Sequence, residues 1–326
     1  MYSILSVNLR KIWGYNCMNL KQAKYIKTIA ECGSITEAAK KLYVSQPSLS
    51  KMLLQIEADI ELTLFDRSVS PFKITFAGER YLVAAEKMLA ANEQLENQLR
   101  EIKNEHLGKL RLGISVQRAM QVMPLVIPVF RFRYPNVVLE LTEDGSANLE
   151  DRLRKGDIDL AFAAIESTGA NMTYELIEKE TIGILAGKGS GIAKRLASGT
   201  PVTLNDARGD SFVYLTQGHS VRVVQDKLFR RYGFHPHMLL QTDSLEVGRR
   251  IVLETGSCML MSNIYVDDYV RQKGGEFFPL ADYENHRHFY ACYRKDDFLT
   301  SYARDFIKIT TEALAKEKEQ NLLHGI

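Results

Sequence analysis

Residues 33–57 read Gly-Ser-Ile-Thr-Glu-Ala-Ala-Lys-Lys-Leu-Tyr-Val-Ser-Gln-Pro-Ser-Leu-Ser-Lys-Met-Leu-Leu-Gln-Ile-Glu, and this stretch decides the fold of the N-terminal part of the chain. Gly33 suits the left-handed position that ends a preceding helix. Ser34 and Glu37, three residues apart, predict a capping box at the start of the next helix. The stretch therefore begins with a short helix, from residue 35 to about residue 42, whose apolar side chains face a core.

A second helix is predicted after a tight turn at residues 43 and 44. Ser45 is a good N-cap, and Pro47 falls in the first turn, where its missing N–H costs nothing. The apolar side chains of this helix form one stripe that should face the core: Leu49, Leu53, Ile56 and Ile60. Two short helices joined in this way are the layout of a helix-turn-helix, so the sequence predicts DNA as a partner.

The opposite face of the second helix carries polar side chains near its N-terminal end, the part of a recognition helix that usually enters the major groove. A glutamine can bind adenine through two hydrogen bonds, a serine suits several bases, and a lysine reaches guanine or a phosphate. The alternative is that these side chains are simply solvated, but the preceding helix and turn favour DNA. The candidate DNA-contacting residues are Ser34, Thr36, Ser45, Gln46, Pro47, Ser48, Ser50 and Lys51.

Four motifs extend this pattern: A-A-x-x-L at 38–42, V-S-Q-P-S-L-S at 44–50, L-F-D-R at 64–67 and T-x-A-G at 75–78. Through these motifs, residues 18–79 resemble the N-terminal domain of LysR-type transcriptional regulators. The resemblance implies a winged helix-turn-helix whose wing, residues 65–74, lies along the DNA backbone, with Arg67 and Lys73 contacting phosphate. The chain departs from the family at Glu61, where a glycine is usual, and at the wing tip, which lacks the arginines of many relatives.

A long helix is predicted after residue 75, ending at about residue 105. Its seam residues recur at spacings of four and three, which is the a/d pattern of a coiled coil, with a central asparagine of the kind that fixes register. The alternative is a helix packed on its own chain; because the helix is flanked by charge and leads out of the DNA-binding domain, we favour a dimer. The predicted dimerisation residues are Tyr81, Ala85, Met88, Asn92, Leu95, Leu99 and Ile102.

From about residue 107, alternating strands and helices predict an α/β fold with a parallel sheet. Sequences such as G-D-I-D-L-A at 156–161 resemble the effector half of the same family, which implies two lobes similar to those of a periplasmic binding protein. The predicted organisation is an N-terminal extension (1–17), a winged helix-turn-helix domain (18–75), a dimerisation helix (76–105) and an effector-binding domain (107–320). Lobe I takes residues 107–180 and 284–320, and lobe II takes residues 181–283.

Ligands of parallel sheets bind beyond the carboxyl ends of the strands, beside helix N-termini. Four such loops carry side chains suited to an effector, although local helix capping is an alternative for each. Family effectors are often small carboxylates, whereas Glu166 and Asp243 would equally favour a cation or an amine. The candidate effector-contacting residues are Ser115, Val116, Gln117, Glu166, Thr216, Gln217, Gly218, His219 and Asp243.

The composition limits the class of protein. The net charge is only +2, so DNA affinity must come from a local basic face and from dimerisation rather than from the whole chain. No apolar run reaches the roughly 18 residues of a membrane span, so we expect a soluble, cytoplasmic protein with no membrane partner. No catalytic motif is present in a plausible setting, so we expect neither an enzyme nor a cofactor or metal site.

The leading hypothesis is an effector-responsive transcriptional regulator of promoter DNA, paired through its long helix and assembled into a homotetramer. RNA polymerase is a candidate further partner. The competing hypothesis is a small-molecule or redox sensor whose N-terminal domain serves protein contacts, with Cys258 and Cys292 as the redox pair. Two ordinary buried thiols are the simpler interpretation of these cysteines, and the wide spacing of all four argues against a disulfide framework or a zinc site.

Overall fold

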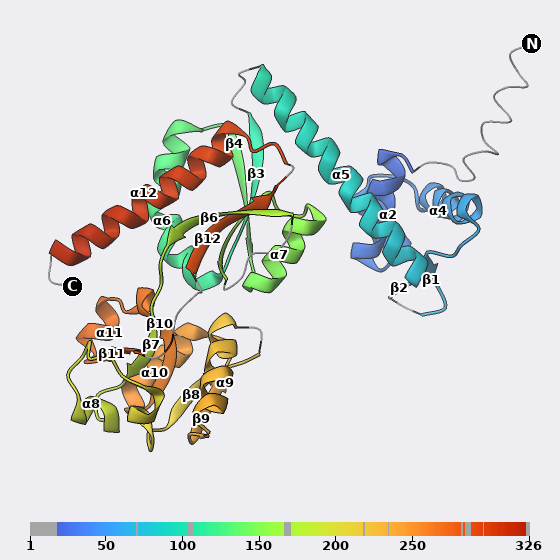
Figure 1. Cartoon of the computed structure of the whole chain (residues 1–326). Coiled ribbons are helices and arrows are strands. Elements are labelled where there is room, and N and C mark those ends of the chain that lie inside the picture. Colours follow the sequence, from blue (N-terminus) through green and yellow to red (C-terminus); the bar gives the residue numbers. More distant parts are fainter. Residues whose placement is uncertain are drawn as a thin grey trace, which may run out of the picture. The chain divides into compact units, whose positions relative to one another are not determined.

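The computed structural model of the chain describes residues 18–69, 71–103, 107–165, 171–217, 219–233, 235–281, 283, 288–295 and 297–323. The predicted extension 1–17 and two candidate effector-contacting residues, Glu166 and Gly218, lie outside the described residues. Contacts between Cα atoms group the chain into an N-terminal unit that ends at Lys103 and a C-terminal unit that comprises most of the later residues (Figure 1).

The described residues of the N-terminal unit form three short helices, a two-stranded hairpin and one long helix (Figure 1). In the hairpin, Phe65 lies opposite Ile74 in an antiparallel pair. This is the element order predicted for a winged helix-turn-helix followed by a linker helix. The elements are α2 (Leu20–Cys32), α3 (Ile35–Lys41), α4 (Gln46–Ile60), β1 (Phe65–Asp66), β2 (Lys73–Ile74) and α5 (Phe76–Ile102).

The ends of these helices follow local chemistry. Gly33 ends α2 in the left-handed conformation, with φ 58°, as predicted. The Ser34 side chain accepts a hydrogen bond from the Glu37 amide, but the Glu37 carboxylate accepts one from Lys40 Nζ at 2.8 Å, so only half of the predicted capping box forms. Glu61 also adopts a left-handed φ of 56°, a conformation that a glycine would take with less strain.

The core of the N-terminal unit lies where the helices α2, α3 and α4 meet. Leu49, Leu53 and Ile56 are at most 2% exposed, which confirms the predicted buried stripe of α4, and Ile60 is half-buried at its end. Opposite them lie apolar residues of α2 and α3, and α5 packs along α2. The orientation of α4 about its own axis is therefore fixed by this core.

Lobe I of the C-terminal unit is a five-stranded sheet, in the order β4-β3-β5-β12-β6, with helices packed on it. Phe130, Phe162, Phe289 and Phe306 form an aromatic cluster in its core. The elements are β3 (Gly108–Ile114), α6 (Val116–Arg133), β4 (Val137–Glu143), α7 (Ser146–Lys155), β5 (Leu160–Ile165), β6 (Met172–Glu178), β12 (His288–Arg294) and α12 (Ser301–Leu323).

Lobe II is a second five-stranded sheet, in the order β11-β7-β10-β8-β9, with its own apolar core. Its elements are β7 (Ile182–Ala186), α8 (Gly191–Arg195), η1 (Leu204–Ala207), β8 (Phe212–Leu215), α9 (Ser220–Tyr232), β9 (Met238–Thr242), α10 (Leu245–Thr255), β10 (Cys258–Ser262), η2 (Asn263–Tyr265), α11 (Asp268–Gln272) and β11 (Glu276–Pro279). Two lobes with separate cores agree with the sequence-based expectation.

The predicted parallel pairing is confirmed for only part of each sheet, because both sheets also contain antiparallel strands. In lobe I, β3 pairs in parallel with β4 and β5, but β12 runs antiparallel to β5 and β6. In lobe II, β7 runs antiparallel to β10 and β11. The chain leaves lobe I after β6 and returns to it as β12, so strand directions depend on these crossings rather than on local periodicity. Helix α6 contains both Pro124 and Pro128.

Within the residues that the structure describes, no helix is long and apolar enough to cross a membrane.

The aromatic core of lobe I predicts a large stability effect for one truncation. Phe306 is fully buried, and its ring centroid lies 5.0 Å from that of Phe130. We expect Phe306→Ala to lower the free energy of unfolding by about 3–5 kcal/mol, because it removes apolar contacts and leaves a cavity. Urea denaturation checks this, with Phe298→Ala as the control, since Phe298 is 45% exposed. Equal losses in the two variants would contradict the assignment of the core.

Candidate nucleic-acid interface and interlobe cleft

The N-terminal half of α4 presents an exposed polar surface. Ser45 Oγ accepts a hydrogen bond from the Ser48 amide at 3.4 Å, which starts the helix at Gln46. The side chains of Gln46 and Lys51 are exposed and bond to no other described residue. The remaining predicted residues of this surface are Pro47 and Ser48, which are exposed, and Ser50, which is half-buried. These side chains can therefore contact a partner without breaking an internal bond.

Three further predicted DNA-contacting residues lie at the start of α3 and on the wing. Thr36 is exposed in the first turn of α3, whereas Ser34 is half-buried and serves as the N-cap of that helix. Lys73 is exposed on β2, opposite Asp66 in the hairpin. The structure thus leaves Thr36 and Lys73 open to solvent, while Ser34 already has a structural role.

Arg67 has an internal partner that the sequence pattern did not predict. Its guanidinium forms an ion pair with Glu57 of α4, whose carboxylate also accepts a hydrogen bond from the Leu64 amide at 2.8 Å. The Glu57 side chain is only 10% exposed. Arg67 therefore joins the base of the wing to α4, and its charge is largely neutralised within the protein.

The predicted seam of α5 falls into a covered part and an exposed part. Tyr81 packs at the edge of the N-terminal core, and Ala85 is fully buried within the chain itself. Met88 and Asn92 are half-buried. Leu95 and Leu99, further along, are 52% and 49% exposed, and the side chain of Ile102 lies outside the described residues. Only the second part of the seam is therefore available to another chain.

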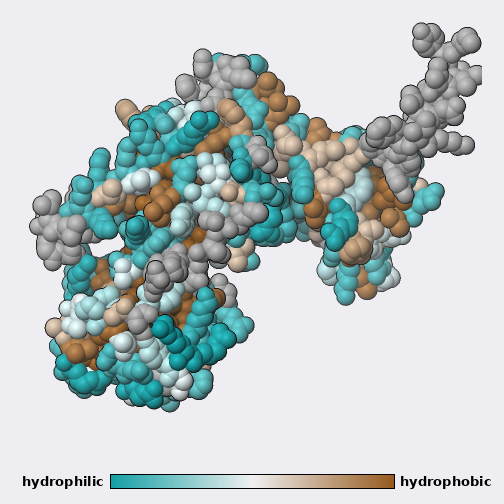
Figure 2. Space-filling model, viewed as in Figure 1, coloured by the Kyte–Doolittle hydropathy of each residue, from teal (hydrophilic) through white to brown (hydrophobic). Residues whose placement is uncertain are grey.

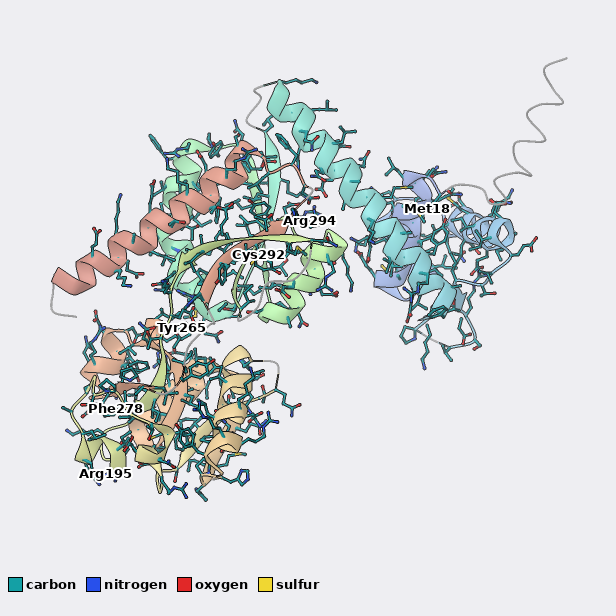
Figure 3. The ribbon with its side chains drawn as sticks, viewed as in Figure 1. Met18, Arg195, Tyr265, Phe278, Cys292 and Arg294 are labelled. Carbon is teal, nitrogen blue, oxygen red and sulfur yellow. The ribbon has the colours of Figure 1, made fainter. Side chains whose placement is uncertain are left out.

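A cavity of about 320 Å³ opens between the two lobes of the C-terminal unit. Loops at the carboxyl ends of β3, β4 and β5 in lobe I and of β8 and β9 in lobe II supply its walls, together with Tyr265, which Figure 3 labels. The lining residues are Ser115, Val116, Gln117, Asp144, Gly145, Ser146, Asn148, Ala164, Leu215, Gln217, His219, Val221, Asp243, Leu245 and Tyr265.

The structure brings most of the candidate effector-contacting residues together in this cavity. Ser115, Val116 and Gln117 come from lobe I, and Gln217, His219 and Asp243 come from lobe II. Thr216 is not among the lining residues; its amide donates a hydrogen bond to the Thr242 carbonyl at 2.9 Å and so joins the ends of β8 and β9. The loop between β4 and α7, which includes Asp144, was missed, although it also lies at the carboxyl end of a strand.

Some polar side chains of the cavity are bonded to other residues of the chain, and others are not. Asp144 is engaged, because it accepts hydrogen bonds from the Gly145 amide and Asn148 at 2.8 Å and pairs with Arg152 at 3.2 Å. Burial raises the pKa of Asp144, but these hydrogen bonds and this ion pair outweigh burial and hold its pKa below the ordinary value.

In contrast, six polar lining side chains bond to no other described residue: Ser115, Gln117, Ser146, Gln217, His219 and Asp243. The local-capping alternative is wrong for Ser115 and His219, because each is an N-cap residue whose side chain makes no capping hydrogen bond. It is also wrong for Asp243, since Ser244 caps α10.

The two cysteines of the redox alternative lie in separate sheets. Cys258 is in β10 of lobe II and Cys292, labelled in Figure 3, is in β12 of lobe I; both side chains are fully buried. Burial raises the pKa of both thiols, that of Cys292 to about 12, which disfavours the reactive thiolate. Among the described residues, no group of three or more His, Cys, Asp or Glu side chains is placed to hold a metal ion.

Comparisons with known proteins cover both units. Residues 20–79 match the model for bacterial regulatory helix-turn-helix proteins of the lysR family, and residues 103–315 match the model for the LysR substrate binding domain. The HTH-type transcriptional regulator YcgK of Bacillus subtilis is 25% identical over 321 residues, which is 94% of this chain and 98% of that protein. The transcriptional dual regulator GltC of the same organism is 28% identical over 236 residues, covering 72% and 77% of the two chains.

Solved structures share the fold of the whole chain. A full-length variant of OxyR from Pseudomonas aeruginosa has a TM-score of 0.66 and 23% identity, covering 91% of this chain and 97% of that one. Full-length CbnR, complexed with its target DNA, has a TM-score of 0.62 and 19% identity, covering 91% and 100%. At these identities the likeness concerns the fold alone.

The Glu57–Arg67 pair predicts that one carboxylate holds the wing in place. We expect Glu57→Gln to lower the free energy of unfolding of the N-terminal unit by about 1–3 kcal/mol, because a partly covered guanidinium loses its charged partner. Glu61→Gln is the matched control, since Glu61 is exposed at the end of the same helix. Thermal unfolding measures the melting temperatures of both variants. Equal melting temperatures for Glu57→Gln and Glu61→Gln would contradict the proposed role of Glu57 in holding the wing.

Proposed function

This chain belongs to the LysR family of DNA-binding transcriptional regulators, and we propose that a small molecule bound in its interlobe cleft controls how it acts on promoter DNA. One observation carries the proposal. Six polar side chains from both lobes converge on a single cavity and are free of internal partners among the described residues. A concave site with a few convergent polar groups is the usual form of a small-molecule site.

For the DNA-binding unit, we propose that the N-terminal half of α4 enters the major groove. Gln46, Ser48 and Ser50 would then meet base edges, since the buried stripe of α4 turns them outward. Lys51 and Lys73 would contact phosphates, and Thr36, exposed on α3, is a further candidate contact. Arg67 would act mainly by holding the wing, because Glu57 neutralises its charge.

The electrostatics of this unit favour a paired regulator. Residues 18–75 contain eight Lys or Arg and six Asp or Glu residues, an excess of two positive charges. Internal ion pairs with Glu37, Glu31 and Glu57 engage three of those cations: Lys40, Lys41 and Arg67. A single unit would therefore bind DNA weakly, whereas two linked units reading two half-sites would gain affinity from both.

Exposed apolar side chains support self-association. Leu95 and Leu99 of α5 are suited to pair with the same helix of a second copy. The edge strands of the two lobes also expose apolar residues, such as Val138 in β4 and Met238 in β9, and Phe132 of α6 is 93% exposed. Figure 2 shows hydrophobic side chains, in brown, at the surface of both units. We propose a dimer through α5 and a tetramer through the effector lobes.

In the proposed mechanism, effector binding closes the lobes and changes the spacing of the paired DNA-binding units. A ligand shifts such an equilibrium only by its difference in affinity for the two states, and contacts from both lobes provide that difference. The altered spacing would change DNA bending and the recruitment of RNA polymerase. The protein would act in the cytoplasm, where bacterial promoter DNA lies.

If α4 reads DNA, one substitution should reduce sequence preference and another should reduce the affinity for all sequences. Gln46→Ala should relax the preference for one base pair, whereas Lys73→Ala should weaken binding to all sequences alike and reduce the slope of log affinity against log salt by about 1. Fluorescence anisotropy with DNA from upstream of the protein's own gene, and with single-base variants, measures both effects over a salt series. Gln55→Ala is the control, because Gln55 is exposed on the C-terminal half of the same helix. A wild-type protein without sequence preference, even at low salt, would contradict the reading.

The exposed half of the α5 seam predicts a disruptable dimer. Leu95→Glu with Leu99→Glu should shift the protein toward smaller species, because four like charges would face each other in the paired seam. Val83→Glu is the matched control, since Val83 is exposed on the same helix but off the seam. Sedimentation velocity measures the distribution of species. An unchanged distribution in the double variant would exclude α5 as the dimer contact.

A further inference from the structure

We propose that the ligand of the interlobe cleft carries a protonated amine, and that the carboxylate of Asp243 binds it. This inference rests on the proposed role of the cleft as the effector site and names the chemical class of its ligand.

The charged groups that line the cavity determine which ligand charge it would favour. Among the described lining residues there is no lysine or arginine, and there are two carboxylates, Asp144 and Asp243. Asp144 already accepts hydrogen bonds from Gly145 and Asn148 and pairs with Arg152. Asp243 is exposed, has no partner among the described residues and is not needed to cap α10. The free charge that the described lining offers to a ligand is therefore negative.

Arginines that could bind an anionic ligand lie in the first two turns of the helices that begin at the cavity. Arg118 of α6 is 1% exposed and lies within 2.9 Å of Glu178 and 2.8 Å of Glu180. Its guanidinium also stacks over the Phe289 ring, 3.9 Å from the centroid. Arg118 directly follows Gln117, which lines the cleft, yet its charge is neutralised by the half-buried Glu178 and the buried Glu180.

The other four arginines in the first two turns of these helices are engaged in the same way. In α10, Arg249 pairs with Glu246 and with Asp267 at 3.0 Å, and Arg250 pairs with Glu246 at 2.6 Å. Arg152 of α7 pairs with Asp144. Arg222 of α9 pairs with Asp226 at 2.8 Å and donates to the Leu215 carbonyl at 2.7 Å. Each of these five cations is thus neutralised by a carboxylate of this chain. An anionic ligand would have to rely on backbone amides, without the bidentate guanidinium that proteins favour for carboxylates.

The neutral groups around Asp243 complete the site. Gln217 and His219 share lobe II with Asp243, and Ser115 and Gln117 face them from lobe I. Amide and hydroxyl oxygens, and the unprotonated ring nitrogen of a neutral histidine, all accept hydrogen bonds. An ammonium group has three N–H donors, so it can bind Asp243 and still use acceptors from the lobes on either side. The ligand would in this way hold the two lobes together.

A matched panel of compounds tests the amine assignment on the full-length protein. The common L-amino acids and the short diaminoalkanes are each compared with the carboxylic acid of the same carbon skeleton that lacks the amine. Thermal-shift measurements find the compounds that bind, and calorimetry measures their dissociation constants. We expect binding only among compounds that carry an amine.

Variants at Asp243 then test whether the charge of this side chain, rather than its shape, binds the amine. Asp243→Asn should weaken amine binding by roughly tenfold or more, because the charge-assisted bond is lost while the shape is kept. Asp243→Lys should abolish amine binding and admit the matching dicarboxylic acids. Asp268→Asn is the control, since Asp268 is an exposed carboxylate of lobe II that does not line this cavity.

The proposal is overturned if no amine binds, if Asp243→Asn leaves amine binding unchanged, or if the carboxylic acids without an amine bind the wild-type protein. Val116→Trp, which would fill the mouth of the cavity, tests separately whether ligands bind in the cleft at all. It therefore distinguishes failure of the amine assignment from failure of the cleft as the effector site. If Val116→Trp abolishes the binding of a carboxylic acid, the cleft remains the effector site and only the amine assignment fails. If no binding responds to Val116→Trp, the cleft assignment fails as well.

Discussion

The burial of one stripe of α4 is the constraint on which DNA recognition depends. Leu49, Leu53 and Ile56 are almost fully buried, and each such side chain contributes roughly 1.5–3 kcal/mol relative to an exposed one. Turning the helix by one residue, about 100°, would expose this stripe and bury polar side chains. The core therefore fixes which side chains face outward, and the same helix holds the wing through Glu57. The surface that we propose to read DNA is therefore set by the fold of the N-terminal unit itself.

The C-terminal unit shows a comparable separation between groups that stabilise the fold and groups that are left free. Arg118, Arg152 and Arg222 are all engaged with carboxylates of the chain, whereas Ser115, Gln217 and the other free side chains of the cleft have no such partners. Each lobe has its own apolar core, so lobe stability does not depend on the cleft being filled. The lobe closure that we propose would therefore not require either lobe to unfold.

The features that sequence predicted well are those set by neighbouring residues. The left-handed Gly33, the N-cap Ser45 and the buried stripe of α4 follow from spacing alone. Strand direction in β7 and β12 was not predictable in this way, because it depends on where the chain crosses between lobes. Tyr81 and Leu95 share one seam pattern, yet only Leu95 is exposed, since α5 packs on its own domain near Tyr81. The ion pair between Arg67 and Glu57 also depends on tertiary packing, so it could not be predicted from the sequence.

The central claim is that occupation of the cleft changes how the protein binds DNA. A DNase I footprint on the DNA upstream of its own gene, recorded with and without a compound that raises the melting temperature, tests this claim most directly. The account predicts that such a compound alters the length of the footprint or the pattern of hypersensitive positions, because lobe closure changes the spacing of the DNA-binding units. A footprint that stays the same with every compound that raises the melting temperature would contradict it.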